Sequence, residues 1–176
     1  MIFGLFRKDP RAPLIDALLR RIGEAARAPA LYMRLGVPDT AEGRFESLAL
    51  HVVLVLRRLR RLPTPAEDVA QELVDAFFRH LDASLREMGV GDMGVPKRMK
   101  KLFRAFYGRA AAYDAALESG DPERVAAALA EPFGGPAEAV FGLARYALGV
   151  EAALAADALD AFLGPGPGFP PPARFA

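Results

Sequence analysis

The 176-residue chain contains no cysteine and no tryptophan, and its only histidines are His51 and His80. Without cysteine there is no disulfide, no thiolate nucleophile and no zinc site built on sulfur. Two histidines also disfavour a histidine-rich metal site. The sequence therefore excludes chemistry that depends on sulfur ligands or on a redox-active disulfide.

The chain also lacks a hydrophobic run long enough to cross a membrane. The longest uncharged apolar run in its first half, residues 47–56, has ten residues, whereas a spanning helix needs about 20. The opening residues, MIFGLFRK, place the apolar block before the charges, which is the reverse of a secretory signal. We therefore expect the protein to stay where it is made, in the cytoplasm.

No catalytic motif is recognisable in the sequence. The glycines of GVGDMG, residues 89–94, follow no strand pattern and lack the spacing of a dinucleotide-binding loop, and no P-loop occurs. His51 falls inside an apolar helical run, so we expect a packed core or interface residue rather than a catalytic base or ligand. His80 is expected at an exposed or boundary position. The sequence predicts a protein that is not an enzyme and that requires no cofactor.

The residues that are present favour helices throughout. Apolar residues make up 52% of the chain, a composition that fits a buried helical bundle. They recur every three or four positions, and no segment alternates as a strand does. We predict an all-α, single-domain bundle of about six or seven helices. The predicted helices cover about residues 13–27, 40–62, 65–88, 96–119, a segment from 122, 136–148 and 150–163, with a short helical turn before Gly36.

The two ends of the chain differ in composition from this bundle, which we place at residues 13–163. The tail, residues 164–176, reads GPGPGFPPPARFA and is predicted to be extended or mobile, because it cannot hold a helix. Residues 1–12 form an apolar and basic segment. Two alternatives are open for this segment: contact with an anionic membrane interface, or packing on the bundle. The residues that would make the membrane contact are Ile2, Phe3, Leu5, Phe6, Arg7 and Lys8.

Positive charge is concentrated although the net charge is only +1. Residues 57–61 read RRLRR, residues 97–101 read KRMKK, and no acid occurs from residue 93 to 113. At about 100° per residue, Lys97, Lys101 and Arg104 lie on one side of the helix predicted over 96–119. Such a face binds phosphate, anionic lipid or acidic protein, or it is only the solvated side of a helix.

The surroundings of this basic helix carry two further expectations. Phe103, Phe106 and Tyr107 fall largely on the core side, which weakens a nucleic-acid interpretation. Asp92 precedes the helix, where its carboxylate is expected to accept hydrogen bonds from the free N–H groups, and Pro96 fixes the helix start. Together they would aim the basic face as a docking surface requires.

Three long segments carry a resemblance to a known family: LYMRLGVPDTAEGRFESLALHVVLVLRRLR (31–60), AQELVDAFFRHLDASLREMGVGD (70–92) and VPKRMKKLFRAFYGRAAAYDAAL (95–117). They resemble the ubiquinol–cytochrome c chaperone family, the assembly factors for cytochrome b in the respiratory bc1 complex. The resemblance covers about residues 31–119. It implies an all-helical, non-enzymatic chaperone that binds newly made cytochrome b and supports its haem acquisition and its entry into the complex.

Mitochondrial members of this family work with a small partner subunit and associate with the ribosome. The chain resembles a bacterial member, since it shows no targeting presequence, and this implies a peripheral position at the inner membrane of a bacterium. Ribosome contact and a partner subunit are open for this chain. RNA or ribosome binding through the basic clusters, and lipid or quinone binding inside the bundle, are the alternative functions.

The resemblance also suggests which residues bind the client. We expect an anion-docking face held in place by Asp92 and Pro96, with Tyr107 and Arg109 at its far end. Arg44 and Phe45, at the start of the helix over 40–62, are candidates for an adjoining groove wall, and for Phe45 a core position is the competing interpretation. The docking face itself consists of Lys97, Arg98, Lys100, Lys101 and Arg104.

Overall fold

The computed structural model describes residues 10–176, and the regular elements of that part of the chain are all helical. The predicted all-α, single-domain fold is confirmed. The residues expected to contact a membrane, Ile2 to Lys8, lie outside the described residues. In chain order the elements are α1 (Ala12–Ala26), α2 (Pro29–Arg34), α3 (Ala41–Arg60), α4 (Ala66–Glu87), α5 (Val95–Glu118), α6 (Pro122–Ala130), the 3-10 turn η1 (Ala137–Val140), α7 (Phe141–Leu154), α8 (Leu159–Leu163) and the 3-10 turn η2 (Pro172–Phe175).

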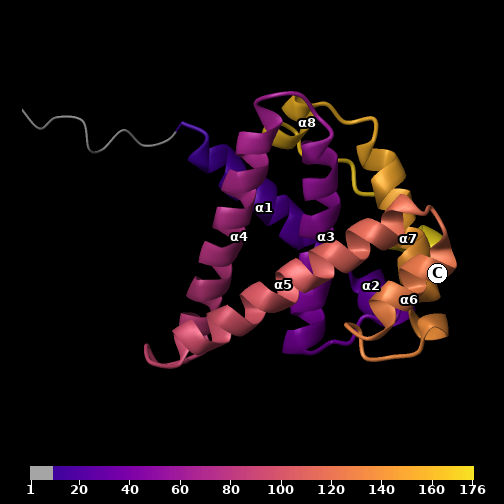
Figure 1. Ribbon diagram of the computed structural model, residues 1–176, viewed down its shortest axis with the longest axis horizontal. Coiled ribbons are helices and arrows are strands. Elements are labelled where there is room, and N and C mark those ends of the chain that lie inside the picture. Colours follow the sequence, from indigo (N-terminus) through magenta and orange to yellow (C-terminus); the bar gives the residue numbers. More distant parts are fainter. Residues whose placement is uncertain (1–9) are drawn as a thin grey trace, which may run out of the picture.

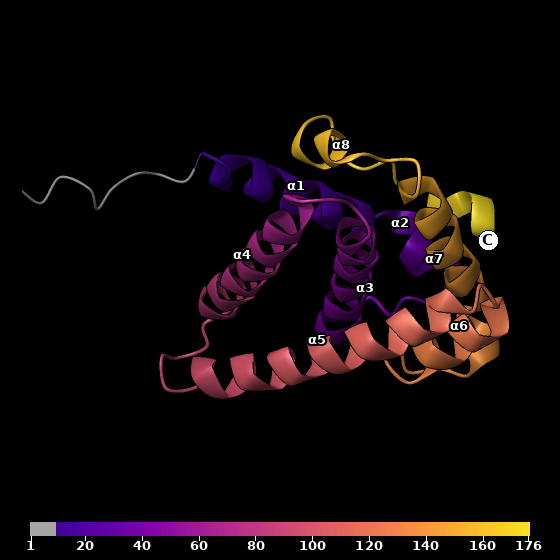
Figure 2. The ribbon, with the colours of Figure 1, turned by 45° about the horizontal axis from the view of Figure 1, so that its top comes forward.

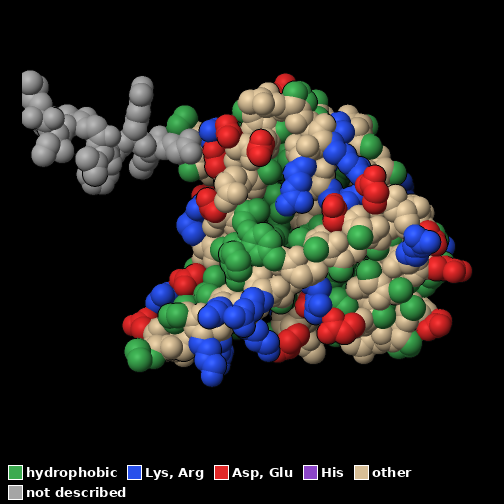
Figure 3. Space-filling view, in the orientation of Figure 1, with side chains coloured by type: hydrophobic (Ala, Val, Ile, Leu, Met, Phe, Trp, Pro, Cys, Tyr) green, Lys and Arg blue, Asp and Glu red, His purple; other side chains and the backbone are tan. Residues whose placement is uncertain are grey.

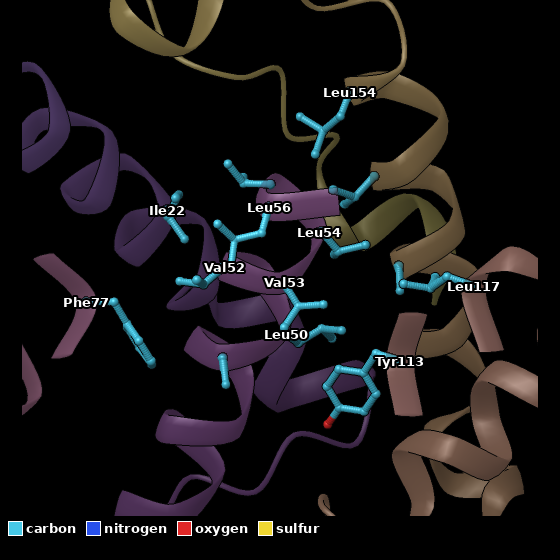
Figure 4. Close-up of a cluster of buried hydrophobic side chains, with 14 of the residues drawn as sticks. Ile22, Leu50, Val52, Val53, Leu54, Leu56, Phe77, Tyr113, Leu117 and Leu154 are labelled. Atoms are coloured by element: carbon cyan, nitrogen blue, oxygen red, sulfur yellow. The ribbon is translucent and has the colours of Figure 1, made fainter. Parts of the chain in front are cut away.

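Helix α3 forms the centre of the molecule, with α1, α4, α5 and α7 packed around it (Figures 1 and 2). Its residues 49–57 are buried without interruption, because a helix covered on all sides carries apolar residues on all sides. Figure 4 shows Leu50 and Val53 of α3 directed toward Tyr113 of α5. The apolar run that could not span a membrane is therefore the middle of the core. Within residues 10–176, no helix is both long and apolar enough to cross a bilayer.

Side-chain caps begin two of the helices, α3 and α6. The Thr40 hydroxyl accepts a hydrogen bond from the N–H of Gly43 at 3.0 Å, and the Asp121 carboxylate accepts one from the N–H of Glu123 at 2.9 Å. Each cap satisfies an N–H group that has no partner within its own helix. These local signals explain why the starts of α3 and α6 are readable from the sequence.

The last helices differ from the prediction. A break was expected near residue 149, but α7 passes through Gly149 without interruption, and the chain leaves the helix only after Leu154. The reason is a tertiary contact, since a Cβ atom at position 149 would lie 2.4 Å from the ring of Phe175. Gly149 makes room for the tail rather than ending a helix.

The C-terminal tail packs on the bundle, contrary to the expectation that it is extended or mobile. The ring of Phe169 lies 5.6 Å from that of His51, and the ring of Phe175 lies 5.6 Å from that of Tyr146. The Arg145 guanidinium donates a hydrogen bond to the Phe175 carbonyl at 2.7 Å. The tail therefore places Phe169 against His51 of α3 and Phe175 against Tyr146 of α7.

Helix α5 reaches beyond the rest of the bundle at its N-terminal end. Its C-terminal half packs on α3 and α6, whereas Figure 2 shows its first turns extending past α3 toward the loop from α4. Between residues 96 and 105 no side chain of α5 is fully buried. This projecting half carries the predicted docking residues.

A candidate docking surface between α4 and α5

The five predicted docking cations lie together on the outer side of the projecting half of α5. They line one shallow hollow, which Gly94 completes. Among residues 10–176, no ion pair occupies any of the five, although fourteen ion pairs form elsewhere in that region. The charges therefore remain available to a partner. We call this set the basic face: Lys97, Arg98, Lys100, Lys101 and Arg104.

Arg109, expected at the far end of this face, is already engaged with two carboxylates. Its Nε lies 3.3 Å from Glu46 of α3, and its Nη1 lies 2.8 Å from Glu131, which follows α6. Glu46 is largely buried, and burial raises the pKa of this carboxyl while the Arg109 charge opposes the rise. Arg109 thus anchors α5 to the bundle, and a direct role in docking stays a prediction.

Asp92 does not cap α5, so the expected hydrogen bonds to the helix N–H groups were wrong. Gly94 precedes the first helical residue and provides no side-chain cap. The Asp92 carboxylate instead accepts a hydrogen bond from Nη1 of Arg86 at 2.7 Å, a charge-assisted contact that ties the loop to the end of α4. Pro96 lies in the first turn of α5, where its missing N–H costs no hydrogen bond.

The aromatic residues of α5 divide between the core and the surface. Phe106 is buried as predicted, but Phe103 is 50% exposed and Tyr107 is 44% exposed, so their expected core-side position was wrong. Both lie on the flank of the projecting half, where only α4 can cover them. Their rings gather around Phe78 of α4, with centroid distances of 4.9 Å from Phe103 and 6.3 Å from Tyr107.

A hollow of about 770 Å³ opens between the two helices at this aromatic cluster. Phe78, Met99 and Phe103 form its apolar part, and Lys100 lines both this hollow and the one on the basic face. Figure 3 shows the hydrophobic patch with a row of Lys and Arg side chains beside it. We call this hollow the α4–α5 groove. Its full lining is Asp75, Phe78, Arg79 and Asp82 from α4, and Met99, Lys100 and Phe103 from α5.

The family model for ubiquinol-cytochrome C chaperones matches residues 33–169 of this chain. The chain belongs to this family. The match runs from α2 into the C-terminal tail, well past residue 119, where the resemblance read from the sequence ends. Membership assigns the chain to the chaperones that serve assembly of the ubiquinol–cytochrome c reductase, the bc1 complex.

A solved structure agrees with this assignment. The crystal structure of the Cbp3 homolog from Brucella abortus is similar to this chain, with 40% sequence identity over 93% of both chains and a TM-score of 0.76. No curated protein matches the chain. The likeness extends over nearly the whole chaperone-family fold, including the helices that form the α4–α5 groove.

Arg44 and Phe45 line neither of the two hollows on α5. Arg44 is exposed and contacts the Asp39 carboxylate at 2.7 Å. Phe45 is half-buried and packs against the core, which agrees with the competing interpretation given for it. A part for either residue in client binding stays a prediction.

The two histidines of this chaperone-family member lie where the sequence places them. His51 is completely buried, and His80 is exposed on α4. Since a carbonyl can only accept, Nδ1–H of His51 donates to the Ser47 carbonyl at 2.7 Å, and Nε2 accepts from the Tyr146 hydroxyl at 2.8 Å. Burial lowers the pKa of His51 to about 4, so the ring is neutral and both of its nitrogens are satisfied.

The second basic cluster, RRLRR, is largely absorbed by the fold. Arg57 is only 4% exposed and forms ion pairs with Asp114, Glu118 and Glu151. Arg61 joins the last two carboxylates at 2.6 and 3.1 Å. Sequence reasoning missed this network, although an arginine that directly follows the ten-residue apolar run 47–56 is itself a signal of a buried ion pair. The cluster links α3, α5 and α7 and is not a free surface for RNA.

Proposed function

We propose that this protein binds newly made cytochrome b and supports its haem acquisition and its entry into the bc1 complex. Family membership supports the assembly role, and the choice of client follows the resemblance of the sequence. The observation that carries the proposal is the continuity of the basic face with the exposed rings of Phe103 and Tyr107. Unpaired charge and uncovered aromatic area together are typical of a binding surface rather than of a solvated helix.

The chemistry of this surface fits a membrane-protein client. Newly made cytochrome b presents apolar helices together with cytoplasm-facing loops, so a chaperone needs both an apolar contact and charged anchors. Phe103 and Tyr107 supply rigid apolar area at low entropic cost, and the basic face pairs with carboxylates of the client. The protein then acts by binding: it holds the client early, prevents premature association and releases it to later steps.

Supporting residues hold this surface at a fixed angle. The Asp92–Arg86 pair fixes the loop before α5, Pro96 sets the start of the helix, and Arg109 anchors its middle to Glu46. Arg44 and Phe45, at the start of α3, would extend the contact. We place the protein peripherally at the inner membrane of a bacterium. A ribosome contact and a small partner subunit are further proposals that the family resemblance suggests.

A deletion strain tests the function. Membranes from cells lacking the gene should lose the b-type haem signal of the bc1 complex in reduced-minus-oxidised spectra, and the unaltered gene should restore it. A variant with Lys97, Arg98, Lys100 and Lys101 changed to Glu should fold but fail to restore the signal. The matched control changes four exposed arginines elsewhere, Arg34, Arg60, Arg124 and Arg174, to Glu.

This control carries the same change in net charge and should restore the spectrum fully. A normal haem spectrum in the deletion strain would contradict the bc1 role. If the charge-reversed α5 variant restored the haem spectrum fully, the bc1 role would stand, but the basic face would have no part in it. Thermal unfolding of both purified variants verifies that each is folded.

A further inference from the structure

We propose that the α4–α5 groove binds an amphipathic helix whose one flank is acidic. The inference deepens the proposed function, on which it rests only for the identity of the client that carries this helix. It concerns the shape of the groove and the different charge of its two walls, neither of which follows from family membership.

The apolar part of the groove suits a helical ridge. Phe78 of α4 lines the hollow together with Met99 and Phe103 of α5. The rings of Phe78 and Phe103 pack against each other with their centroids 4.9 Å apart, so they form an apolar bottom of the hollow. Helix-in-groove recognition places apolar side chains at positions i, i+3, i+4 and i+7 into such a trough. Half of the Phe103 side chain is uncovered, so an occupant has aromatic surface left to bury.

The two walls differ in charge. The α4 wall carries both signs of charge, since Arg79 lines it together with Asp75 and Asp82. Asp82 contacts Arg86 at 2.7 Å, and Asp75 accepts a hydrogen bond from Gln71 at 3.0 Å. On α5, Lys100 lines the groove without an ion pair among the described residues, and the rest of the basic face lies directly behind it. A helix in the groove is therefore favoured when carboxylates lie on its α5-facing flank, which also fixes its orientation.

The same features argue against a lipid or nucleic-acid occupant. The α4 rim of the hollow carries Asp75 and Asp82 beside Arg79, so it offers no continuous row of cations to the phosphates of an anionic bilayer or an RNA strand. A flat bilayer also leaves the bottom of a concave surface uncovered, whereas the apolar ridge of a helix fills it. A helix with an apolar ridge and one acidic flank complements both the apolar bottom of the groove and the cations of its α5 wall.

A designed helical peptide tests the proposal directly. The peptide carries leucines at i, i+3, i+4 and i+7, a row of glutamates on one flank and one tryptophan on the ridge. Because the protein contains no tryptophan, emission at the tryptophan wavelength reports the peptide alone. Two comparison peptides replace the glutamates by lysines or the leucines by serines.

We expect the acidic amphipathic peptide to bind the full chain with a blue shift of its emission. Phe103→Ser and Lys100→Glu should each weaken binding by about tenfold or more, as for residues central to an interface. Arg34→Glu, on the exposed surface of α2, is the matched control and should leave binding unchanged. The proposal would be overturned if the lysine peptide bound as tightly as the acidic peptide, or if Phe103→Ser had no effect on binding.

Two further outcomes separate the groove from the function. If the peptide does not bind while the deletion strain loses its b-type haem, the groove proposal fails and the chaperone function stands. If the peptide binds as expected while bc1 assembly is normal without the gene, the groove stands and cytochrome b is not its client. Binding to phosphatidylglycerol vesicles that Phe103→Ser and Lys100→Glu both weaken, without peptide binding, would assign the surface to lipid and overturn the proposal.

Discussion

A single buried ring makes the stability of this fold depend on pH. Burial lowers the pKa of His51 from 6.5 to about 4. At a pH between these two values, the His51 ring is protonated in the unfolded chain and neutral in the folded chain. The stabilisation is therefore complete above pH 6.5 and is lost as the pH falls toward 4. We expect His51 to account for a loss of about 2 kcal/mol between pH 7.5 and pH 5, measured by urea unfolding.

The control for this prediction is His51→Gln. The glutamine amide can donate to the Ser47 carbonyl and accept from the Tyr146 hydroxyl, but it does not titrate. The variant should lose less stability than the unaltered chain over the same pH interval, by about the amount given. Identical pH profiles for the two proteins would contradict a neutral, buried His51.

At the scale of single residues, burial was predictable but partners were not. The apolar run around His51 indicates a packed ring, yet its hydrogen-bond partner Tyr146 lies 95 positions away in the sequence. For Asp92 the predicted partner was wrong. Its position before a helix suggests a cap, whereas Arg86, on the other side of the loop, offers a stronger, charged donor. Such choices depend on which tertiary neighbour is within reach.

Among the secondary-structure elements, the C-terminal tail should stabilise the bundle through Phe175. Gly149→Ala would place a methyl group 2.4 Å from the Phe175 ring, so the ring must move and we expect a loss of about 1–3 kcal/mol. In a chain ending after Leu163 the same substitution should be neutral or stabilising by up to about 1 kcal/mol, because alanine favours a helix over glycine. Chemical unfolding of the four proteins measures both effects. An equal loss in both backgrounds would contradict the packed tail.

The helix network around Arg57 gives a second prediction at this scale. Arg57→Ala removes the buried cation that joins α3 to Asp114 and Glu118 of α5 and to Glu151 of α7. We expect a loss of about 3 kcal/mol in unfolding free energy. Arg60→Ala, an exposed arginine in the same cluster, should change it by less than about 0.5 kcal/mol. Similar effects of the two substitutions would show that the cluster is a solvated surface.

Helices with regular apolar spacing were predictable, and α1, α3, α4 and α5 begin and end within about two residues of the expected positions. The helices at the end of the chain were not predictable. Gly149 suggests a helix break from the sequence alone, because the Phe175 ring that packs against it is 26 positions away. Local propensity cannot reveal a glycine that is required by a neighbour from another segment.

For the molecule as a whole, the sequence predicted the basic face but not the α4–α5 groove beside it. Periodicity alone places Phe103 and Tyr107 toward the core. Their exposure arises because α5 extends past α3 and meets only α4 there (Figure 2). The groove is a product of how two helices diverge, and this depends on the packing of the entire bundle.

The central claim, that this surface holds cytochrome b, is tested most directly by site-specific crosslinking in living cells. A photoreactive phenylalanine analogue replaces Tyr107 in one strain and Met33, which is 74% exposed on α2, in a control strain. After pulse labelling and irradiation, position 107 should give an adduct with newly made cytochrome b, and position 33 should not. Absence of the adduct at 107 in cells that assemble a normal bc1 complex, or equal adducts at both positions, would contradict the account.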